Sequence, residues 1–197
     1  MINIPFVNQD PRLQASLREL ARRSVDGSID GYRVLKHSMG NTADSSAIAS
    51  TASETNFSLN KTLSTSQFFP GRIFKLSASG VYSTTGTPTL VFKVKFGTTA
   101  LITFTAKTGI NNASNQSWRV DAVIIVRTTG ATGTVLPYGT LFINTASGVD
   151  TVETVVNSAV TVDTTANQTL QVSLTWGASS SSNTATMKAF LSEVSDY

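Results

Sequence analysis

The chain has no cysteine and only one histidine among its 197 residues. The absence of cysteine excludes disulfides, thiolate metal sites and a cysteine nucleophile. With a single imidazole, any transition-metal site would have to be built mainly from carboxylates. The sequence therefore gives no sign of a metal centre or a cofactor, and we expect neither.

Charge is scarce, and so are long apolar runs. Only 14% of residues are charged and the net charge is +3, with no basic run longer than Arg22-Arg23, so we expect no nucleic-acid partner. No apolar stretch approaches the roughly 18 residues that would span a membrane. The start Met1-Ile-Asn-Ile-Pro-Phe6 also lacks the basic residues and apolar run of a secretory leader, so we expect no membrane partner.

Hydroxyl side chains are abundant instead. The chain contains 29 threonines and 25 serines, a bias that suits strands with one solvent-exposed face. No threonine occurs in the first 40 residues, which hold ten of the 27 charges. This change in composition predicts an N-terminal arm and helix over residues 1–40, a polar linker over 41–53 and a β domain over 54–197.

Asp10 and Pro11 precede the segment "RLQASLRELARR", and together they predict a short helix. Its leucines fall on one side, as in a short coiled coil or an amphipathic docking helix. So short a helix needs a partner surface or copies of itself to be stable. The apolar tail before it either joins that contact or folds back onto the β domain. The predicted particle-attachment or trimer-contact residues are Ile2, Ile4, Phe6, Val7, Leu13, Leu17 and Leu20.

Beyond residue 53, apolar and polar residues alternate with a period of two in segments separated by short polar turns. This pattern predicts a mainly β fold, an antiparallel β-sandwich of jelly-roll type, joined to the short N-terminal helix and extended arm. On 117–128 the face opposite the core includes Val123 and Ile125, and we expect it to be part-covered. The predicted strands are 56–63, 71–79, 90–96, 99–105, 117–128, 134–144, 151–156, 159–163, 168–177 and 184–194.

Three ordered blocks resemble a recurrent β module of tailed-phage and prophage virion proteins. They are "GRIFKLSASGVYSTTGTPTLVFKVKFG", "WRVDAVIIVRTTGATGTV" and "VTVDTTANQTLQVSLTWGASSSSNT". The resemblance covers residues 53–194 and includes no catalytic signature. It implies a non-enzymatic virion component, often trimeric, found in fibres, tail-associated proteins or capsid decoration. It does not extend to residues 1–40.

The residues that could carry chemistry favour structural roles. The single histidine, His37, lies beside the predicted linker with no nucleophile elbow elsewhere in the chain. Asp121 lies within a strand and is interpreted as a cross-strand ion pair, while Asp150 and Glu153 are interpreted as solvated ends of a turn. Trp118 and Trp176 are in register with apolar faces and are expected in the core rather than on a sugar-binding surface. We therefore expect no enzymatic activity.

The leading hypothesis is a virion structural protein, assembled in the host bacterial cytoplasm. In its specific form the protein is a homotrimeric capsid decoration or cement protein, anchored by its N-terminal segment on the major capsid protein or on tail proteins. A tail-fibre or tail-associated glycan-binding protein is the alternative, and exposure of Tyr82, Tyr138 or Tyr197 would favour it. A carbohydrate-active enzyme would require two acids facing each other across a groove.

Overall fold

The computed structural model describes four stretches of the chain, residues 28–29, 32–33, 37–145 and 150–195. The chain forms two compact units, Met1–Lys36 and His37–Tyr197. Within the first unit, β1 (Ser28–Ile29) pairs antiparallel with β2 (Tyr32–Arg33). The expected helix and apolar tail lie outside the described residues.

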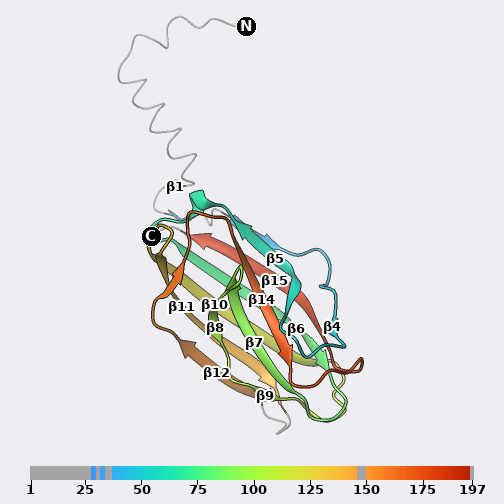
Figure 1. Ribbon diagram of the computed structural model, residues 1–197. Helices are drawn as coiled ribbons and strands as arrows, with labels where there is room; N and C mark the ends of the chain where they lie inside the picture. The colour runs from blue at the N-terminus through green and yellow to red at the C-terminus, as the bar shows by residue number, and fades with distance from the viewer. Residues whose placement is uncertain (1–27, 30–31, 34–36, 146–149, 196–197) are drawn as a thin grey trace, which may run out of the picture. The chain divides into compact units, whose positions relative to one another are not determined.

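The second unit consists of two antiparallel sheets that lie one over the other (Figure 1). The larger sheet has eight strands in the order β12-β11-β10-β6-β15-β3, with β13 paired to β11 and β4 paired to β15. Its strands are β3 (His37–Gly40), β4 (Ile48–Ala49), β6 (Ile73–Ser83), β10 (Gln116–Thr128), β11 (Gly133–Asn144), β12 (Asp150–Val156), β13 (Val160–Val162) and β15 (Thr184–Ser195).

The smaller sheet has five strands in the order β5-β14-β7-β8, with β9 paired to β7. Its strands are β5 (Thr55–Leu63), β7 (Thr89–Phe96), β8 (Thr99–Thr103), β9 (Lys107–Thr108) and β14 (Gln168–Trp176). A short 3-10 turn, η1 (Thr65–Gln67), follows β5. The mainly β class and the two antiparallel sheets are confirmed, while the jelly-roll connection stays a prediction.

Aromatic side chains from both sheets meet in the core between them. The Trp118 ring of β10 lies 5.2 Å from the Phe57 ring and 4.9 Å from the Phe92 ring, measured between centroids. Its indole nitrogen donates to the Val81 carbonyl, so the burial leaves no polar group unpaired. Trp176 is likewise buried and donates to the Ile48 carbonyl at 3.2 Å. Both tryptophans are therefore core residues, as the strand alternation predicts.

Each of the ten predicted strands is present, with ends that shift by a few residues. The short strands β3, β4 and β9 were not predicted. Their two to four residues are too few to display a period of two, and a neighbouring strand defines each of them.

The segment expected as a linker, residues 41–53, contributes to the larger sheet. It contains β4, which pairs with β15. The Asn41 side chain accepts from the Phe190 amide at 2.7 Å, and the Ser45 hydroxyl accepts from the Met187 amide at 2.9 Å. These bonds satisfy backbone groups of β15, so the segment is held against the sheet.

Candidate interaction face

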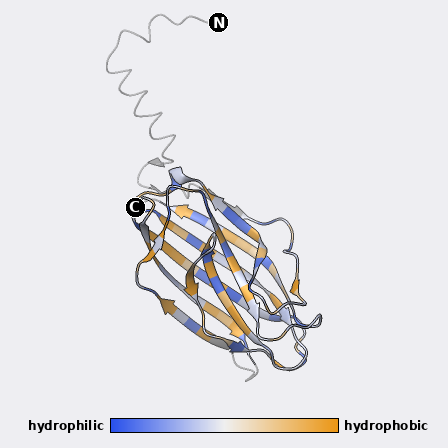
Figure 2. Ribbon diagram, in the orientation of Figure 1, coloured by the Kyte–Doolittle hydropathy of each residue, from blue (hydrophilic) through white to orange (hydrophobic). Residues whose placement is uncertain are grey.

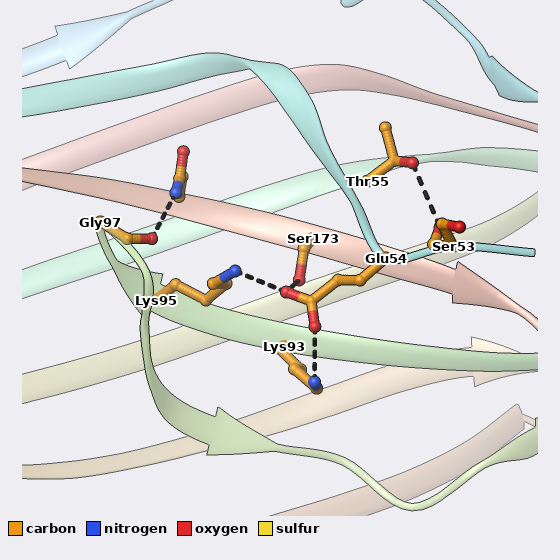
Figure 3. A network of polar contacts seen from close by, with 8 residues as sticks. Ser53, Glu54, Thr55, Lys93, Lys95, Gly97 and Ser173 are labelled. Carbon is orange, nitrogen blue, oxygen red and sulfur yellow. Dashed lines mark hydrogen bonds and ion pairs between the residues drawn. The ribbon is translucent and has the colours of Figure 1, made fainter.

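The outer face of the smaller sheet is polar and its charges are paired. Figure 3 shows the Glu54 carboxylate between two lysines of β7, 2.6 Å from Lys93 Nζ and 2.5 Å from Lys95 Nζ. The Ser173 hydroxyl also donates to this carboxylate at 3.0 Å. Partial burial raises the Glu54 pKa, but the bonds from Lys93, Lys95 and Ser173 outweigh that effect and hold it at about 2.

The outer face of the larger sheet differs, because large apolar side chains are exposed among its polar ones. Its strand register places Tyr138 of β11 between Val156 of β12 and Val123 of β10, and Phe142 between Val152 and Arg119. We call this surface the apolar face. Its side chains are Lys75, Ser77, Ser79 and Val81 from β6, Arg119, Asp121, Val123 and Ile125 from β10, Leu136, Tyr138, Thr140 and Phe142 from β11, Val152, Thr154 and Val156 from β12, and Leu191 and Glu193 from β15.

All the large hydrophobic side chains that are exposed in the described residues belong to this face. Val156 is 72% exposed, the highest value among them. They come from three strands, and Figure 2 shows apolar and polar residues alternating along those strands. The full set is Tyr138, Phe142, Val152, Val156 and Leu191. A cluster of exposed apolar side chains on one surface is typical of an interaction site.

Polar side chains on the apolar face form hydrogen bonds and an ion pair with one another. Arg119 Nε donates to Asp121 Oδ2 at 2.6 Å, and the Ser77 hydroxyl donates to Asp121 Oδ1 at 2.7 Å. The Arg119 guanidinium also lies 5.2 Å from the centre of the Phe142 ring. We expected a cross-strand ion pair for Asp121, but its partner Arg119 lies on the same strand, β10. The contact of Asp121 across strands is the hydrogen bond from Ser77 of β6.

Two hollows interrupt the apolar face where short side chains lie between long ones. The first has a volume of about 270 Å³ and contains Ser77, Asp121 and Thr140, with Tyr138 and Leu191 also among its walls. The second, of about 360 Å³, is lined by Val81, Arg119, Phe142 and Lys188, among others. Ridges and hollows of this size give the face a relief into which a partner's side chains can pack.

The remaining acids of interest are fixed by neighbours from other strands. Glu153 of β12 accepts from the Thr105 amide at 3.1 Å and hydroxyl at 2.9 Å, and lies 2.8 Å from Lys107 Nζ. Partial burial raises its pKa, but these contacts outweigh burial and lower it. Glu153 therefore links β12 to the segment after β8, and the prediction that it is a solvated residue at the end of a turn is wrong. Asp150 begins β12 opposite Asn144.

Few of the residues named from sequence lie on this face. The seven predicted attachment residues, Tyr197 and the predicted helix lie outside the described residues. Tyr82 is buried and donates to the Asn144 carbonyl, whereas Tyr138 is 40% exposed. Val123 and Ile125 are half-buried, as expected. The backbone of His37 pairs with Val194 in the larger sheet.

Of the five exposed hydrophobic side chains, only Tyr138 was named from the sequence, as a residue whose exposure would favour glycan binding. A signal for four of them exists in "TVLPYGTLFIN" and "TVETVV", where apolar residues fall on both faces of a strand. Across the described residues, no group of three or more histidines or acids is placed to hold a metal ion. The same part of the chain contains no helix with the length and apolar character needed to cross a membrane.

No family model matches the chain, and no curated protein matches it. Among solved structures it is similar to the CBM2 module of the evolved Dit of Lactobacillus casei BL23 phage J-1, with 10% identity, a TM-score of 0.36, and coverage of 70% of this chain and 69% of that one. It is also similar to winged bean acidic lectin complexed with methyl-alpha-D-galactose, with 10% identity, a TM-score of 0.34, and coverage of 81% and 98%.

A third similar structure is the legume lectin-like domain from Entamoeba histolytica, with 9% identity, a TM-score of 0.26, and coverage of 75% of this chain and 78% of that one. At these TM-scores the similarities assign neither a function nor a partner to this chain.

Proposed function

We propose that this protein is a non-enzymatic structural protein of a phage-type particle, and that its β-sandwich binds an apolar protein surface through the apolar face. One observation carries the proposal. Every exposed large hydrophobic side chain in the described residues lies on that face, whereas the outer face of the smaller sheet carries the paired charges around Glu54 and exposes none. Burial of apolar area is the main favourable term in protein association.

The acids of the sandwich favour a structural role over catalysis. Asp121 and Glu193 both line the first hollow, so two acids do share one depression. Asp121, however, is already bound by Arg119 and Ser77.

The more specific expectations stay predictions. They are the homotrimer, the capsid position, contact with the major capsid protein or tail proteins, and anchoring by Ile2, Ile4, Phe6, Val7, Leu13, Leu17 and Leu20. The virion localisation rests on the resemblance of residues 53–194 to phage virion modules.

Co-sedimentation with particles assembled without this protein tests the proposal. We expect the wild-type chain to bind, and Val156→Asp to bind at least about tenfold more weakly because it places a charge in an apolar contact. Thr62→Asp adds the same charge to an exposed position of β5 and serves as the matched control. Equal binding by all three proteins, with unchanged circular dichroism, would refute a role for the apolar face.

Glycan binding is a second candidate, and one observation favours it. The exposed Tyr138 ring stands beside Ser77, Asp121 and Thr140 in the first hollow, which combines an aromatic surface with hydrogen-bonding groups. Titration with neutral hexoses and N-acetylhexosamines, followed by the amide NMR signals of Thr140 and Val123, tests it. Signal changes that saturate in the wild type and vanish in Tyr138→Ala would support glycan binding, and unchanged signals in the wild type would refute it.

A further inference from the structure

We propose that the occupant of the apolar face is a second copy of this chain, and that the two copies pack these faces together about a two-fold axis. The inference rests on the proposed function, since it names the partner of the same face. In a two-fold contact the same patch serves on both copies, so the patch must be complementary to itself in charge, shape and area.

The charges in the central part of the apolar face balance. Lys75 and Arg119 are basic, and Asp121 and Glu193 are acidic. Two further basic residues border them among the described residues: Arg127 is exposed near the end of β10, and Lys188 of β15 is paired with Asp44. An excess of one sign in the contact would repel a second copy, and the four central charges leave no such excess.

Two of these charges are available for contacts between copies. Lys75 of β6 and Glu193 of β15 are directly opposite each other in the register, yet neither forms an ion pair with another described residue. Arg119 and Asp121, by contrast, satisfy each other. In a two-fold contact Lys75 of one copy can meet Glu193 of the other, and the symmetry makes each such pair twice.

The relief of the face also suits a copy of itself. One row across the strands, Val156, Tyr138 and Val123, stands beside a lower row that contains Thr140, Asp121 and Ser77. The first hollow lies along the lower row. When one sheet is turned over onto another, the high row of each copy can occupy the low row of its partner, as side chains interdigitate between packed sheets.

The area is sufficient for a stable contact. Five strands spaced about 4.8 Å apart, over the seven residues from Leu136 to Phe142 of β11, give a flat footprint of roughly 550 Å² per copy. Protruding side chains add accessible surface to that footprint. Stable interfaces begin near 600 Å² per partner, so the face is of the required size.

Light-scattering mass of the full chain over a range of concentrations is the first measurement. We expect a concentration-dependent approach to twice the 20.9 kDa of one chain, in place of the homotrimer that the resemblance to phage modules implies. Lys75→Glu and Glu193→Lys should each weaken the dimer about tenfold or more, because each places like charges opposite one another in both symmetry-related pairs. Thr62→Asp, on the other sheet, should leave the dimer unchanged.

Mixing the two charge-reversal variants gives the decisive test. One variant then presents acids where the other presents bases, so an equimolar mixture should form a mixed dimer although neither variant does so alone. The double variant K75E/E193K should dimerise like the wild type. A mixture that stays monomeric, or a mass of three chains, would refute the two-fold contact.

Failure of this inference is distinguishable from failure of the proposed function. If the chain remains monomeric at all concentrations while Val156→Asp still loses particle binding, the second copy is refuted and the role of the apolar face stands. If Val156→Asp changes neither mass nor particle binding, both are refuted. Unchanged circular dichroism of each variant shows that the comparison concerns folded protein.

Discussion

Val156 of β12 lies directly opposite Tyr138 of β11, and both side chains are exposed on the outer face of the eight-stranded sheet. An aromatic and a β-branched side chain directly opposite each other contribute roughly 0.2–1 kcal/mol to a sheet. No other part of the described chain covers this pair, so most of its apolar surface is expected to contribute to association and only the mutual contact to folding.

Substitution of Val156 should therefore separate the two properties. We expect Val156→Asp to change the free energy of unfolding by no more than about 1 kcal/mol, because the side chain is largely in water and only its contact with Tyr138 is lost. Urea unfolding of dilute protein measures this. A loss of several kcal/mol at a concentration where the chain is monomeric would show that Val156 is part of the fold's own core.

Trp118 should be one of the most sensitive positions in the core. It packs on Phe57 of the smaller sheet's β5 and on Phe92 of β7, so it joins the two sheets. We expect Trp118→Ala to lower the free energy of unfolding by about 3–5 kcal/mol through lost burial and the remaining cavity. Urea unfolding followed by near-UV circular dichroism measures the change, and a cost below about 1 kcal/mol would contradict the packing described.

Gly80 should tolerate no side chain. A Cβ at this position would lie 2.1 Å from the Thr186 carbonyl oxygen and 2.8 Å from the Trp118 ring. We expect Gly80→Ala to destabilise by about 1–3 kcal/mol, because the backbone of β15 or the Trp118 ring must move. Gly40→Ala, where no atom lies within 4 Å of the added carbon, is the control and should be nearly neutral. Similar melting temperatures for both variants would contradict this prediction.

Acid should weaken the sandwich in part through Glu54. Its folded-state pKa is about 2, below the ordinary value of 4.5, so the folded state binds fewer protons than the unfolded state between those values. Its contribution is complete above about pH 4.5 and is lost as the pH falls toward 2. We expect Glu54→Gln to have a smaller loss of stability over that interval, measured by urea unfolding at a series of pH values. Parallel curves for the two proteins would refute the assignment.

Truncation should locate the start of the folded β unit. The unit begins at His37, and β3 pairs with β15 through residue 40. We expect removal of residues 1–36 to leave the melting temperature of the sandwich nearly unchanged. Removal of residues 1–40 should lower it, because the backbone groups of β15 from Leu191 to Val194 lose their partners on that side. Equal melting temperatures would place the boundary at residue 40, as the composition suggests.

The core and the principal strands follow from local physics. Leu90, Phe92, Val94 and Phe96 alternate with polar or half-buried residues, and a strand is the structure that places such residues on one side. The same argument places Trp118 and Trp176 inside the sandwich. No partner strand needs to be known for these predictions.

Contacts between segments far apart in the sequence could not be predicted in this way. Glu153 lies in a short strand, and no residue near it in the sequence predicts that Thr105 and Lys107 will bind its carboxylate. Glu54 likewise precedes β5, and its lysines come from β7. Such contacts depend on how strands are ordered, which a period of two does not specify.

The sequence by itself determined that this chain forms strands and which side of each strand is apolar, because alternation is a property of a single segment. The short polar turns between the segments added that the strands pair antiparallel in two sheets around one core. Only the tertiary structure decided that the outer face of the smaller sheet is polar and that the outer face of the larger sheet exposes apolar side chains. The residues Phe142, Val152 and Leu191 belong to three different strands, and they share one surface because the sheet order β12-β11-β10-β6-β15 places those strands in one layer. That order is set by long-range backbone pairing between segments far apart in the chain.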